Sequence, residues 1–348
     1  MNAMNFNFLR DDPLPPNGRR VAIIGAGPSG LAAAGYLGGL GYQVDAYDKL
    51  PSPGGLMTFG IPSHRIPSER IDAGVRILER RLGVNFHCAT KVCCSAPLHE
   101  EEGDHFSAEM IGLGELVDDH DAVLICTGAW KSRKPGLPGE VLPGVYSGLE
   151  FLFPIRAARY ARPDVTVPKV EGKRVAVIGA GHSAMDAAHS ANHLGAAEVS
   201  VVYRRTRNDA PCGTFEIDRL EELGIRWMEK TSPLEILGDD HVEGMRVSGP
   251  EGESVLDVDV VIYAIGEIPT PPFAGKLGLE NIRKGDVRWL NMTSIDNVFV
   301  AGDVLSGPSK VGKAVESGLK AARSLANWLD LKGENREAEF HGSEKVGR

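Results

Sequence analysis

The sequence predicts an α/β fold made of two Rossmann-like domains, one inserted into the other. Three observations lead to this prediction. A glycine-rich segment that begins at Val21 recurs in altered form at Val175, a short apolar run precedes the glycines in both copies, and a stretch rich in small residues follows them. A strand, a glycine turn and a helix in this order begin the β-α-β unit of dinucleotide-binding domains.

The first copy reads VAIIGAGPSGLAAAGYLGGLGYQVDAYDK from Val21. Residues 21–24 form an apolar run of strand length, and residues 31–41, after the glycines, have the pattern of a helix. A second apolar run, 44–47, completes a β-α-β unit whose two strands are parallel neighbours.

The second copy reads VAVIGAGHSAMDAAHSANHLGAAEVSVVYRR from Val175. It predicts a strand over residues 175–178, a helix over 183–195 and a strand over 199–203. The first glycines of the two copies lie 154 residues apart. The repeat is therefore a duplication of whole domains and not a short solenoid repeat.

Three further apolar runs end at or close to a glycine, as parallel strands do where they stop beneath a ligand. They are AVLICTG (122–128), VVIYAIG (260–266) and VFVAGD (298–303). The last run comes after the second glycine turn. We therefore expect the chain to return to the first domain, so that the second domain is an insertion.

The expected domain boundaries follow from these runs. The first domain is predicted over 1–155 and 288–333, the second over 156–287, and a charged tail that is mobile or bound to a partner over 334–348. The proline-bearing segments KPGLPGEVLPG and IPTPPF are the expected crossing points between domains.

Length and composition narrow the class of protein. The 348 residues suggest two domains of about 100 to 200 residues each. A net charge of -9 gives no reason to expect nucleic acid or an anionic membrane as a partner. No apolar run approaches the ~18 residues of a membrane span, and the N-terminus does not read as a signal peptide, so the expected location is cytoplasmic.

In the first copy, three glycines and one acid have distinct expected roles. Gly25 permits the tight turn, Gly27 lets the backbone approach a pyrophosphate, and Gly30 lets helix and strand pack closely. Asp48 follows Gly25 by 23 residues, where a carboxylate accepts hydrogen bonds from the adenosine ribose. The alternative, a tight turn without a ligand, leaves the charge of Asp48 at the end of a buried strand unexplained.

The second turn keeps Gly179 and Gly181 and has Ala184 in the third glycine position, a substitution that the fingerprint tolerates. Arg204 and Arg205 follow the next strand in place of the acid. Guanidinium groups suit a 2′-phosphate, so NADP is favoured over NAD. The alternative for the segment RRTR is a solvated loop that makes surface ion pairs and binds no phosphate. Two unlike turns predict two dinucleotides, FAD on the first and a nicotinamide cofactor on the second.

The ordered motifs resemble those of the two-dinucleotide-binding-domain flavoproteins, and more closely the FAD-bearing small subunit of NADPH-dependent glutamate synthase. The motifs that carry the resemblance are GGLMTFGIPSHRIP, CTGAWKSRKPGLPGE, GAGHSAMDAA, VVYRRT, AIGEIP, VFVAGD and GPSKVGKAVESGLKAA. They extend over about residues 19–329. The resemblance implies an NAD(P) domain inserted into an FAD domain.

The resemblance also implies two sets of cofactor-binding residues. Arg65 would approach the flavin, Asp303 would bind the ribityl chain, and the backbone at Val311 would donate to the flavin. The full FAD set is Gly25, Gly27, Pro28, Ser29, Gly30, Asp48, Lys49, Gly55, Leu56, Arg65, Val92, Thr127, Gly128, Gly302, Asp303, Val311 and Ala314. The NADP or NAD set is Gly179, Gly181, His182, Ser183, Ala184, Arg204, Arg205, Gly266 and Glu267.

Hydride transfer between a nicotinamide and a flavin needs no side-chain acid or base, so we predict no catalytic residue. The five cysteines contain no C-x-x-C pair, which disfavours a dithiol exit for electrons and predicts no metal site. The glutamate synthase small subunit carries an N-terminal iron–sulfur domain, whereas about twenty residues precede the first strand here.

The predicted function is that of an FAD-dependent NAD(P)H oxidoreductase subunit that exchanges electrons with an iron–sulfur partner protein. The larger complex would be glutamate synthase-like or another oxidoreductase, such as an aldehyde oxidoreductase. One alternative is a freestanding NADPH:ferredoxin or disulfide reductase. Another is a non-catalytic sensor of redox state or nucleotides.

Overall fold

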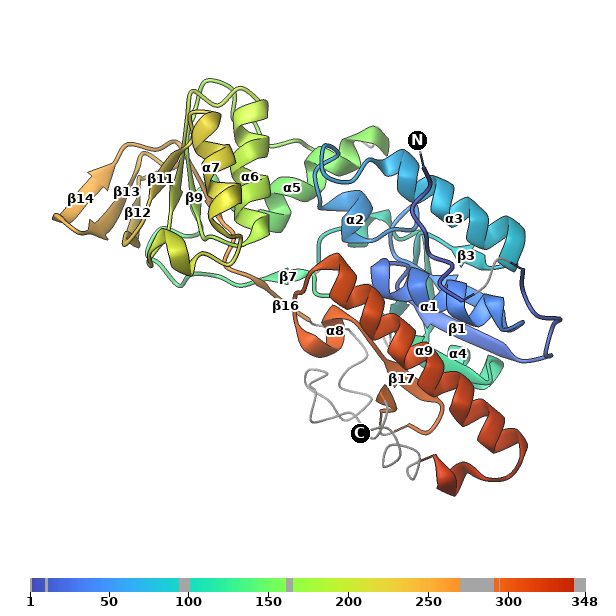
Figure 1. Cartoon of the computed structure of the whole chain (residues 1–348). Helices are drawn as coiled ribbons and strands as arrows, with labels where there is room; N and C mark the ends of the chain where they lie inside the picture. Colours follow the sequence, from blue (N-terminus) through green and yellow to red (C-terminus); the bar gives the residue numbers. More distant parts are fainter. Residues whose placement is uncertain are drawn as a thin grey trace. The chain divides into compact units, whose positions relative to one another are not determined.

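A computed structural model describes residues 2–9, 12–93, 101–160, 165–269, 291–293 and 295–340 (Figure 1). The chain divides into two compact units. The first contains Met1–Thr58, Ile66–Lys131 and Ile268–Arg348, and the second contains Phe59–Arg65 and Ser132–Glu267. The second unit is thus made mainly of one segment that interrupts the first, as the order of the motifs predicts.

A five-stranded parallel sheet forms the centre of the first unit, in the order β17-β6-β1-β2-β3. Its strands are β1 (Arg20–Ile24), β2 (Gln43–Tyr47), β3 (Asn85–His87), β6 (Ala122–Ile125) and β17 (Val298–Val300). The runs predicted as strands from the first copy are confirmed. Because β17 pairs with β6, the sheet needs residues from both ends of the sequence.

Several helices and short strands complete the first unit. α1 and α9 lie side by side although they come from opposite ends of the sequence (Figure 1). The helices are α1 (Pro28–Gly39), α2 (Leu56–Phe59), which runs into the second unit, α3 (Ser68–Leu82), α4 (Leu113–Asp119), α8 (Asp303–Ser306) and α9 (Val311–Gly333). The shorter elements are β4 (Thr90–Cys93), η1 (Asp104–Phe106), β5 (Glu109–Gly112) and η7 (Glu337–Glu339).

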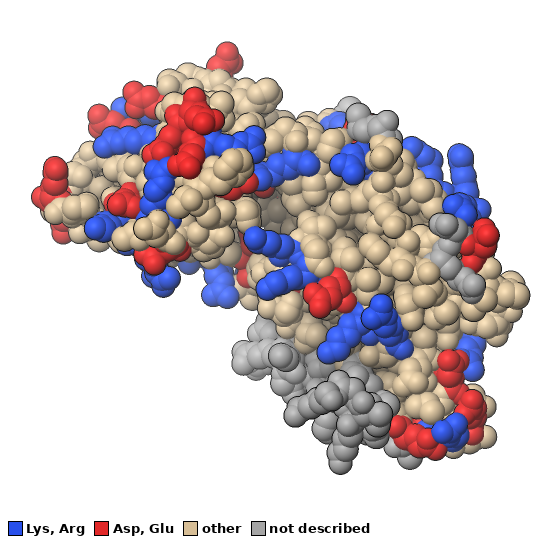
Figure 2. Space-filling model, in the orientation of Figure 1, with Lys and Arg blue, Asp and Glu red and all other residues tan. Residues whose placement is uncertain are grey.

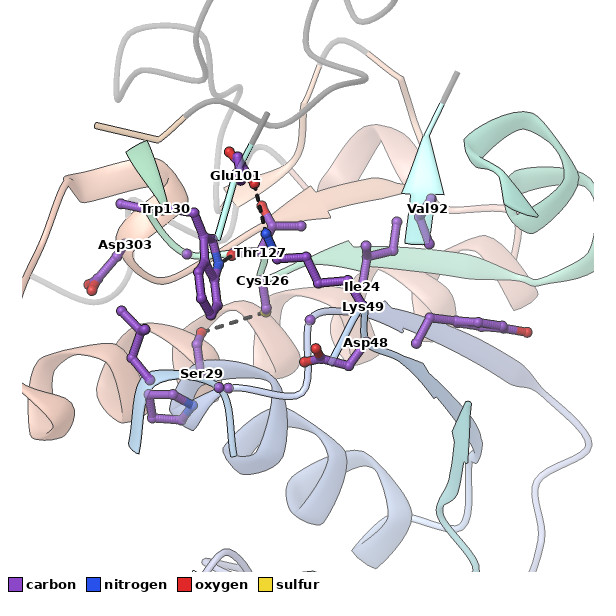
Figure 3. Close-up of a pocket in the computed structure, with 18 of the residues that line it drawn as sticks. Ile24, Ser29, Asp48, Lys49, Val92, Glu101, Cys126, Thr127, Trp130 and Asp303 are labelled. Carbon is purple, nitrogen blue, oxygen red and sulfur yellow. Dashed lines mark hydrogen bonds and ion pairs between the residues drawn. The ribbon is translucent and has the colours of Figure 1, made fainter. Parts of the chain in front are cut away.

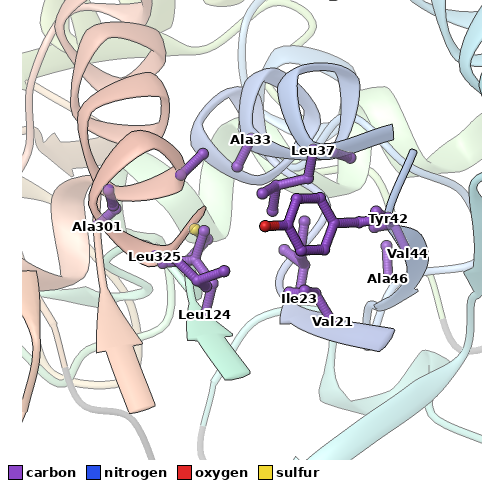
Figure 4. Packing of buried hydrophobic residues seen from close by; sticks show 14 of the residues in the cluster. Val21, Ile23, Ala33, Leu37, Tyr42, Val44, Ala46, Leu124, Ala301 and Leu325 are labelled. Carbon is purple, nitrogen blue, oxygen red and sulfur yellow. The ribbon is translucent and has the colours of Figure 1, made fainter. Parts of the chain in front are cut away.

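Apolar side chains fill the space between this sheet and the helices α1 and α9 (Figure 4). Val21 and Ile23 of β1 are fully buried there, together with Val44 of β2, Leu124 of β6 and Leu325 of α9. Burial of a side chain of this kind contributes about 1.5–3 kcal/mol. The core therefore holds the glycine turn after β1 between a fixed strand and a fixed helix.

Two glycines let backbone segments approach closely in the first unit. A Cβ on Gly30 would overlap the carbonyl oxygen of Gly25, so Gly30 has the packing role expected of the third glycine of the turn. A Cβ on Gly318 of α9 would overlap the carbonyl oxygen of Ser29. Gly318 therefore brings the last long helix against the start of α1, a contact that the sequence does not predict.

A second five-stranded parallel sheet forms the centre of the second unit, in the order β11-β10-β9-β15-β8. Its strands are β8 (Val145–Ser147), β9 (Arg174–Ile178), β10 (Glu198–Val202), β11 (Arg226–Met228) and β15 (Val260–Tyr263). β9 and β10 correspond to β1 and β2 of the first unit. The duplication predicted from the two glycine segments is confirmed.

The second unit also contains helices and a small antiparallel sheet in the order β12-β13-β14. Its helices are α5 (Gly148–Ala157), η2 (Ala158–Tyr160), α6 (His182–His193), η3 (Arg207–Asp209) and α7 (Thr214–Glu222). The antiparallel strands are β12 (Ser232–Leu237), β13 (Gly244–Gly249) and β14 (Gly252–Leu256). Where the chain passes between the units, β7 (Lys131–Ser132) pairs with β16 (Glu267–Ile268).

The crossing into the main segment of the second unit lies between Lys131 and Ser132, earlier than the predicted boundary at residue 155. β8 and α5 belong to the second unit because β8 pairs in parallel with β15. The predicted return at residue 288 lies outside the described residues. Across the described ranges, no helix combines the length and the apolar character needed to cross a lipid bilayer.

The predicted tail begins with packed residues. Phe340 is 1% exposed, and its ring centroid lies 6.4 Å from that of Phe299 in β17. Phe340 therefore belongs to the core of the first unit, although residues 334–337 and Glu339 before it are exposed. Residues 341–348 lie outside the described part of the chain.

Candidate functional site

A pocket lies in the first unit at the carboxyl ends of β1, β2 and β6 (Figure 3). Open parallel sheets bind their ligands at this edge. The predicted FAD residues that line it are Gly25, Gly27, Pro28, Ser29, Asp48, Lys49, Gly55, Leu56, Val92, Thr127, Gly128, Asp303 and Ala314. The other lining residues are Ile24, Tyr47, Thr90, Lys91, Glu101, Cys126, Ala129 and Trp130.

Gly25 makes the tight turn at the end of β1. Its φ is +100°, and its N–H donates to the carbonyl oxygen of Tyr47 at 2.7 Å. A Cβ at this position would overlap the carbonyl oxygen of Cys126. The turn therefore packs against the ends of both neighbouring strands, β2 and β6, and only glycine fits at this position.

Gly27 caps the N-terminus of α1 in an extended conformation, with φ -75° and ψ -171°. A Cβ there would meet only the Cα of Gly55, at 3.9 Å, so packing alone does not require glycine. The helix starts with Pro28 and has no acidic side chain in its first turn. Free N–H groups and the helix dipole suit a pyrophosphate, and the bare Cα of Gly27 leaves room for one.

Asp48 stands at the end of β2 and is 7% exposed. Its Oδ2 accepts a hydrogen bond from the N–H of Ala26 at 2.7 Å, and its Oδ1 accepts one from the N–H of Leu50 at 2.9 Å. Burial raises the pKa of Asp48 above its usual value, although both hydrogen bonds oppose the rise. A carboxylate here is costly to bury, and a ribose that donates two hydroxyl groups would offset that cost.

A cluster of four charged side chains forms one side of the pocket. Lys49 Nζ lies 3.0 Å from Glu101 Oε2 and 3.0 Å from Asp104 Oδ1, and Lys91 Nζ lies 2.6 Å from Asp104 Oδ2. Burial opposes ionisation of Asp104, but the charge of Lys49 and the hydrogen bonds of both lysines lower its pKa. The two lysine charges are thus balanced by two carboxylates.

Asp303 and its neighbours lie where β17 leads into α8. Gly302, with φ +78°, precedes it, and a Cβ on Gly302 would lie 2.9 Å from the Cβ of Ser29. Burial raises the pKa of Asp303, while a 2.6 Å hydrogen bond from the hydroxyl of Ser309 opposes the rise. Asp303 therefore lines the pocket as a hydrogen-bond acceptor whose side chain is held in place by the hydroxyl of Ser309.

A polar cluster around the buried Asp45 contacts Tyr47, which lines the pocket. Its ring stacks on His87 with centroids 4.5 Å apart, and His87 Nε2 lies 3.3 Å from Asp45 Oδ1. Asp45 also contacts Arg20 at 3.2 Å and His120 at 3.4 Å. Although burial opposes it, hydrogen bonds from these groups hold the pKa of Asp45 well below its usual range.

Four residues predicted for FAD do not line this pocket. Gly30 is buried inside α1, Gly302 packs against Ser29, and Val311 is the first residue of α9. Arg65 belongs to the second unit, where it forms ion pairs with Asp186 of α6 and Glu216 of α7. The role of Arg65 near a flavin stays a prediction.

Some lining residues were not predicted from the sequence. Trp130 lies within the CTGAW motif, and Lys91 is adjacent to the predicted Val92, so both had a local signal. Glu101 had no local signal in the sequence, because it reaches the pocket through its ion pair with Lys49, which is 52 residues away in the sequence.

The second turn has the same construction as the first. Gly179 has φ +130° and its N–H donates to the carbonyl oxygen of Val202 at 3.1 Å. Gly181 caps α6 with φ -80°, and a Cβ there would meet nothing within 4 Å. A Cβ on Gly179 would overlap the carbonyl oxygen of Ala264, so this position requires glycine. The third position holds the fully buried Ala184.

His182 and Ser183, also predicted, are the first residues of α6. Gly266, with φ +109°, and Glu267 lie at the end of the second unit's segment. The predicted residues Gly181, His182 and Ser183 thus lie together at the start of α6.

Arg204 and Arg205 follow β10 and are exposed. The next arginine in this loop has a different role, because Arg207 forms ion pairs with Asp218 and Glu221 of α7. Acidic and basic side chains are mixed over the face of this unit drawn in Figure 2. Arg207 therefore fits the interpretation of this segment as a loop with surface ion pairs. The assignment of Arg204 and Arg205 to a 2′-phosphate stays a prediction.

Asp186 is the buried member of the ion-pair cluster around Arg65. Burial raises its pKa to about 6, against the opposing charge and hydrogen bonding of Arg65. The ring of His64, beside Arg65, lies against that of His189 of α6, with centroids 4.0 Å apart and planes tilted by 32°. Burial and the neighbouring positive groups lower the pKa of both histidines.

The cysteines of the described residues form no disulfide with one another, and most of them are buried. Cys88 is half-buried, and Cys93, Cys126 and Cys212 are buried. Burial raises the pKa of Cys88 and of Cys126 to about 12. Cys94 lies outside the described residues. Within the described ranges, no three His, Cys, Asp or Glu side chains are grouped so as to hold a metal ion.

Comparison with known proteins finds similarity over most of the chain. The family described as pyridine nucleotide-disulphide oxidoreductase matches residues 19–318. The glutamate synthase [NADPH] small chain of Halomonas elongata is 30% identical over 341 residues, which cover 90% of this chain and 68% of that protein. The NADP(+)-dependent formate dehydrogenase subunit beta of Moorella thermoacetica is 32% identical over 339 residues, which cover 90% of this chain and 44% of that protein.

Among solved structures, FprA of Mycobacterium tuberculosis in complex with NADPH has the same fold. The TM-score is 0.72 at 21% sequence identity, and the match covers 93% of this chain and 86% of FprA. The two-domain α/β fold predicted from the sequence is confirmed.

Proposed function

Since the chain belongs to the pyridine nucleotide-disulphide oxidoreductase family, we propose that it carries electrons between NADP(H) and an iron–sulfur partner protein by way of FAD. The family makes the chain an oxidoreductase with FAD and a pyridine nucleotide as cofactors. One observation carries the proposal: the same β-α-β turn occurs twice, and a buried Asp48 follows the first whereas exposed Arg204 and Arg205 follow the second.

The first unit is the proposed FAD domain. Gly27 and the N-terminus of α1 would hold the pyrophosphate, and Asp48 would accept from the adenosine ribose. Asp303 would accept from the ribityl chain. Bound FAD supplies the redox chemistry, since it accepts a hydride from a nicotinamide and releases electrons to a further acceptor.

The second unit is the proposed NADP domain. Gly181 would let the pyrophosphate approach the start of α6, and Arg204 and Arg205 would bind the 2′-phosphate. The names of the two relatives support NADP, since one is an NADPH glutamate synthase chain and the other an NADP(+)-dependent formate dehydrogenase subunit.

The proposed electron acceptor is an iron–sulfur protein and not a dithiol of this chain. Cys126 is the cysteine that lines the FAD pocket, and burial raises its pKa to about 12. A thiol with that pKa is not a thiolate at neutral pH and does not exchange with a disulfide. The two relatives above are named as subunits or chains of larger enzymes, which supports a separate partner.

Rapid mixing of the purified full chain, loaded with FAD, tests this function. NADPH should bleach the visible absorption of the flavin quickly, and NADH more slowly. Dye reduction by the chain alone, without glutamate synthesis or aldehyde oxidation, would support a role as an electron-transfer subunit. Reduction of an added ferredoxin would support the iron–sulfur partner.

Two results would count against the proposal. A chain that binds both nucleotides but whose flavin is not bleached by NADPH or NADH would be a sensor and not a reductase. A chain that stays colourless in the presence of FAD would have no internal electron carrier.

A further inference from the structure

Trp130 lies inside the FAD pocket in a fixed orientation (Figure 3). It follows β6 closely, after a turn in which Gly128 has φ +77°. The indole Nε1–H donates to the carbonyl oxygen of Thr127 at 2.7 Å. This short local hydrogen bond fixes the edge of the indole and so orients the ring where it lines the pocket.

Lys49 approaches the ring of Trp130. Its Nζ lies 4.3 Å from the ring centroid, a distance typical of a cation–π contact. The same ammonium group is held by Glu101 and Asp104, and the side chains of Lys49 and Asp104 are 12% and 1% exposed. Because Lys49 is anchored on two carboxylates, it fixes the indole from one side.

The positions of Lys49 and Trp130 along the pocket determine which part of a bound dinucleotide they would contact. A pyrophosphate on the turn at Gly27 places the ribose at Asp48, and the base continues beyond the ribose. Lys49 directly follows Asp48 in the sequence, and Lys91 and Trp130 line the same pocket. The adenosine half of FAD would therefore lie beside Lys49 and Trp130.

The charges at this end of the pocket favour a base over a phosphate. Lys49 and Lys91 would attract a phosphate if they stood alone. Asp104 pairs with both of them, and Glu101 pairs with Lys49, so their charges are already neutralised. This part of the pocket wall therefore combines an aromatic ring with paired charges, which suits an uncharged adenine.

We propose that Trp130 stacks against the adenosine half of FAD, and that Lys49, held by Glu101 and Asp104, positions the indole for this contact. The inference rests on the proposed function, because it concerns the FAD of that same site. It adds a specificity element: the first turn takes a dinucleotide with an unphosphorylated adenosine, whereas the second turn, with its two arginines, takes the phosphorylated one.

Titration of the flavin-free full chain with FAD tests the stacking. Loss of one base–aromatic contact by alanine substitution weakens binding by about 5- to 150-fold, so Trp130→Ala should raise the Kd for FAD by an amount in that range. Trp130→Phe keeps an aromatic face and should raise it less. Trp227→Phe, in the second unit, is the matched control and should leave the Kd unchanged.

Tryptophan fluorescence gives a second readout that a merely structural role would not change. FAD should quench the emission of the wild-type chain strongly, and Trp130→Phe should remove a large part of the quenched signal, whereas Trp227→Phe should not. This measurement remains available if Trp130→Ala does not fold.

Variants of Lys49 test its positioning role. Lys49→Met should raise the Kd for FAD, and Lys49→Arg should restore most of the affinity, because a guanidinium also stacks on an aromatic ring and pairs with carboxylates.

The outcomes separate the inference from the proposed function. If the wild-type chain binds FAD and a folded Trp130→Ala binds it equally well, with the quenched emission unchanged in Trp130→Phe, the stacking is wrong and the proposed function stands. If the wild-type chain does not bind FAD, both are wrong.

Discussion

The carboxylate of Asp48 accepts a 2.7 Å hydrogen bond from the N–H of Ala26, which lies between the first two glycines of the turn. The residue expected to bind the ribose thus also holds the phosphate turn in shape. One side chain therefore links the conformation of the turn to the binding of the nucleotide, and the first prediction concerns it.

Asp48→Ala should weaken FAD binding and also lower the stability of the protein. The substitution removes the acceptor for the buried N–H groups of Ala26 and Leu50. Each buried donor left without a partner costs about 1–3 kcal/mol. FAD titration and urea unfolding of the flavin-free chain measure the two effects. Asp48→Asn, which keeps one acceptor oxygen, should lie between wild type and alanine; equal FAD affinity in all three would contradict the ribose assignment.

Gly27→Ala and Gly30→Ala should separate binding from folding. A Cβ on Gly27 meets only Gly55 Cα at 3.9 Å, so this variant should fold with nearly wild-type stability yet bind FAD at least about tenfold more weakly. A Cβ on Gly30 overlaps the carbonyl oxygen of Gly25, so that variant should be unstable. Thermal unfolding and FAD titration distinguish them. Tight FAD binding by Gly27→Ala would argue against a pyrophosphate at this turn.

Replacement of both Arg204 and Arg205 by Gln should weaken NADPH more than NADH. A charge-assisted hydrogen bond contributes about 1.5–3 kcal/mol, so the ratio of KM values should shift by about tenfold or more. Arg226→Gln is the control, since Arg226 is an exposed arginine of the same unit. Equal losses for both nucleotides would leave these arginines without a role at the 2′-phosphate.

Cys126→Ala should retain the rate at which NADPH reduces the flavin. The thiol is buried and accepts a long 3.6 Å contact from the hydroxyl of Ser29, and its raised pKa of about 12 keeps it protonated. Stopped-flow reduction compares the variant with wild type. A large loss of reductase activity in this variant, with FAD still bound, would revive the alternative of a disulfide reductase.

Asp45→Asn should make the free energy of unfolding fall less steeply as the pH is lowered. Hydrogen bonds in the fold lower the pKa of Asp45 below the unfolded value of 3.8. The stabilisation is therefore present above that value and is lost as the pH falls through the folded pKa. Unfolding free energies between about pH 3 and pH 7 measure the slope. Asp257→Asn, at a side chain that is 80% exposed, is the control and should keep the wild-type slope.

The sequence predicts those features that depend on local pattern. The apolar runs at Val21 and Val175 give the two central strands, the glycines give the turns, and the interval from Gly25 to Asp48 gives the ribose acid. Each of these features is set within one β-α-β unit. Short-range chemistry is enough to predict them.

The features that were missed depend on contacts between distant segments. Glu101 enters the pocket only because Lys49 pairs with it, and Gly318 matters only because α9 returns to cover Ser29. β8 joins the second sheet because its partner β15 lies far along the chain. No local pattern marks such residues, since their roles arise from packing of segments that are far apart in sequence.

The contact between Gly318 and Ser29 has a consequence for synthesis of the protein. A nascent chain emerges from the ribosome N-terminus first, and domains fold as units as they appear. The main segment of the second unit, residues 132–267, is complete before β17 and α9 exist. The first glycine turn is made earliest but can be covered only after the last helix has been made, so the inserted domain is expected to fold before the domain that surrounds it.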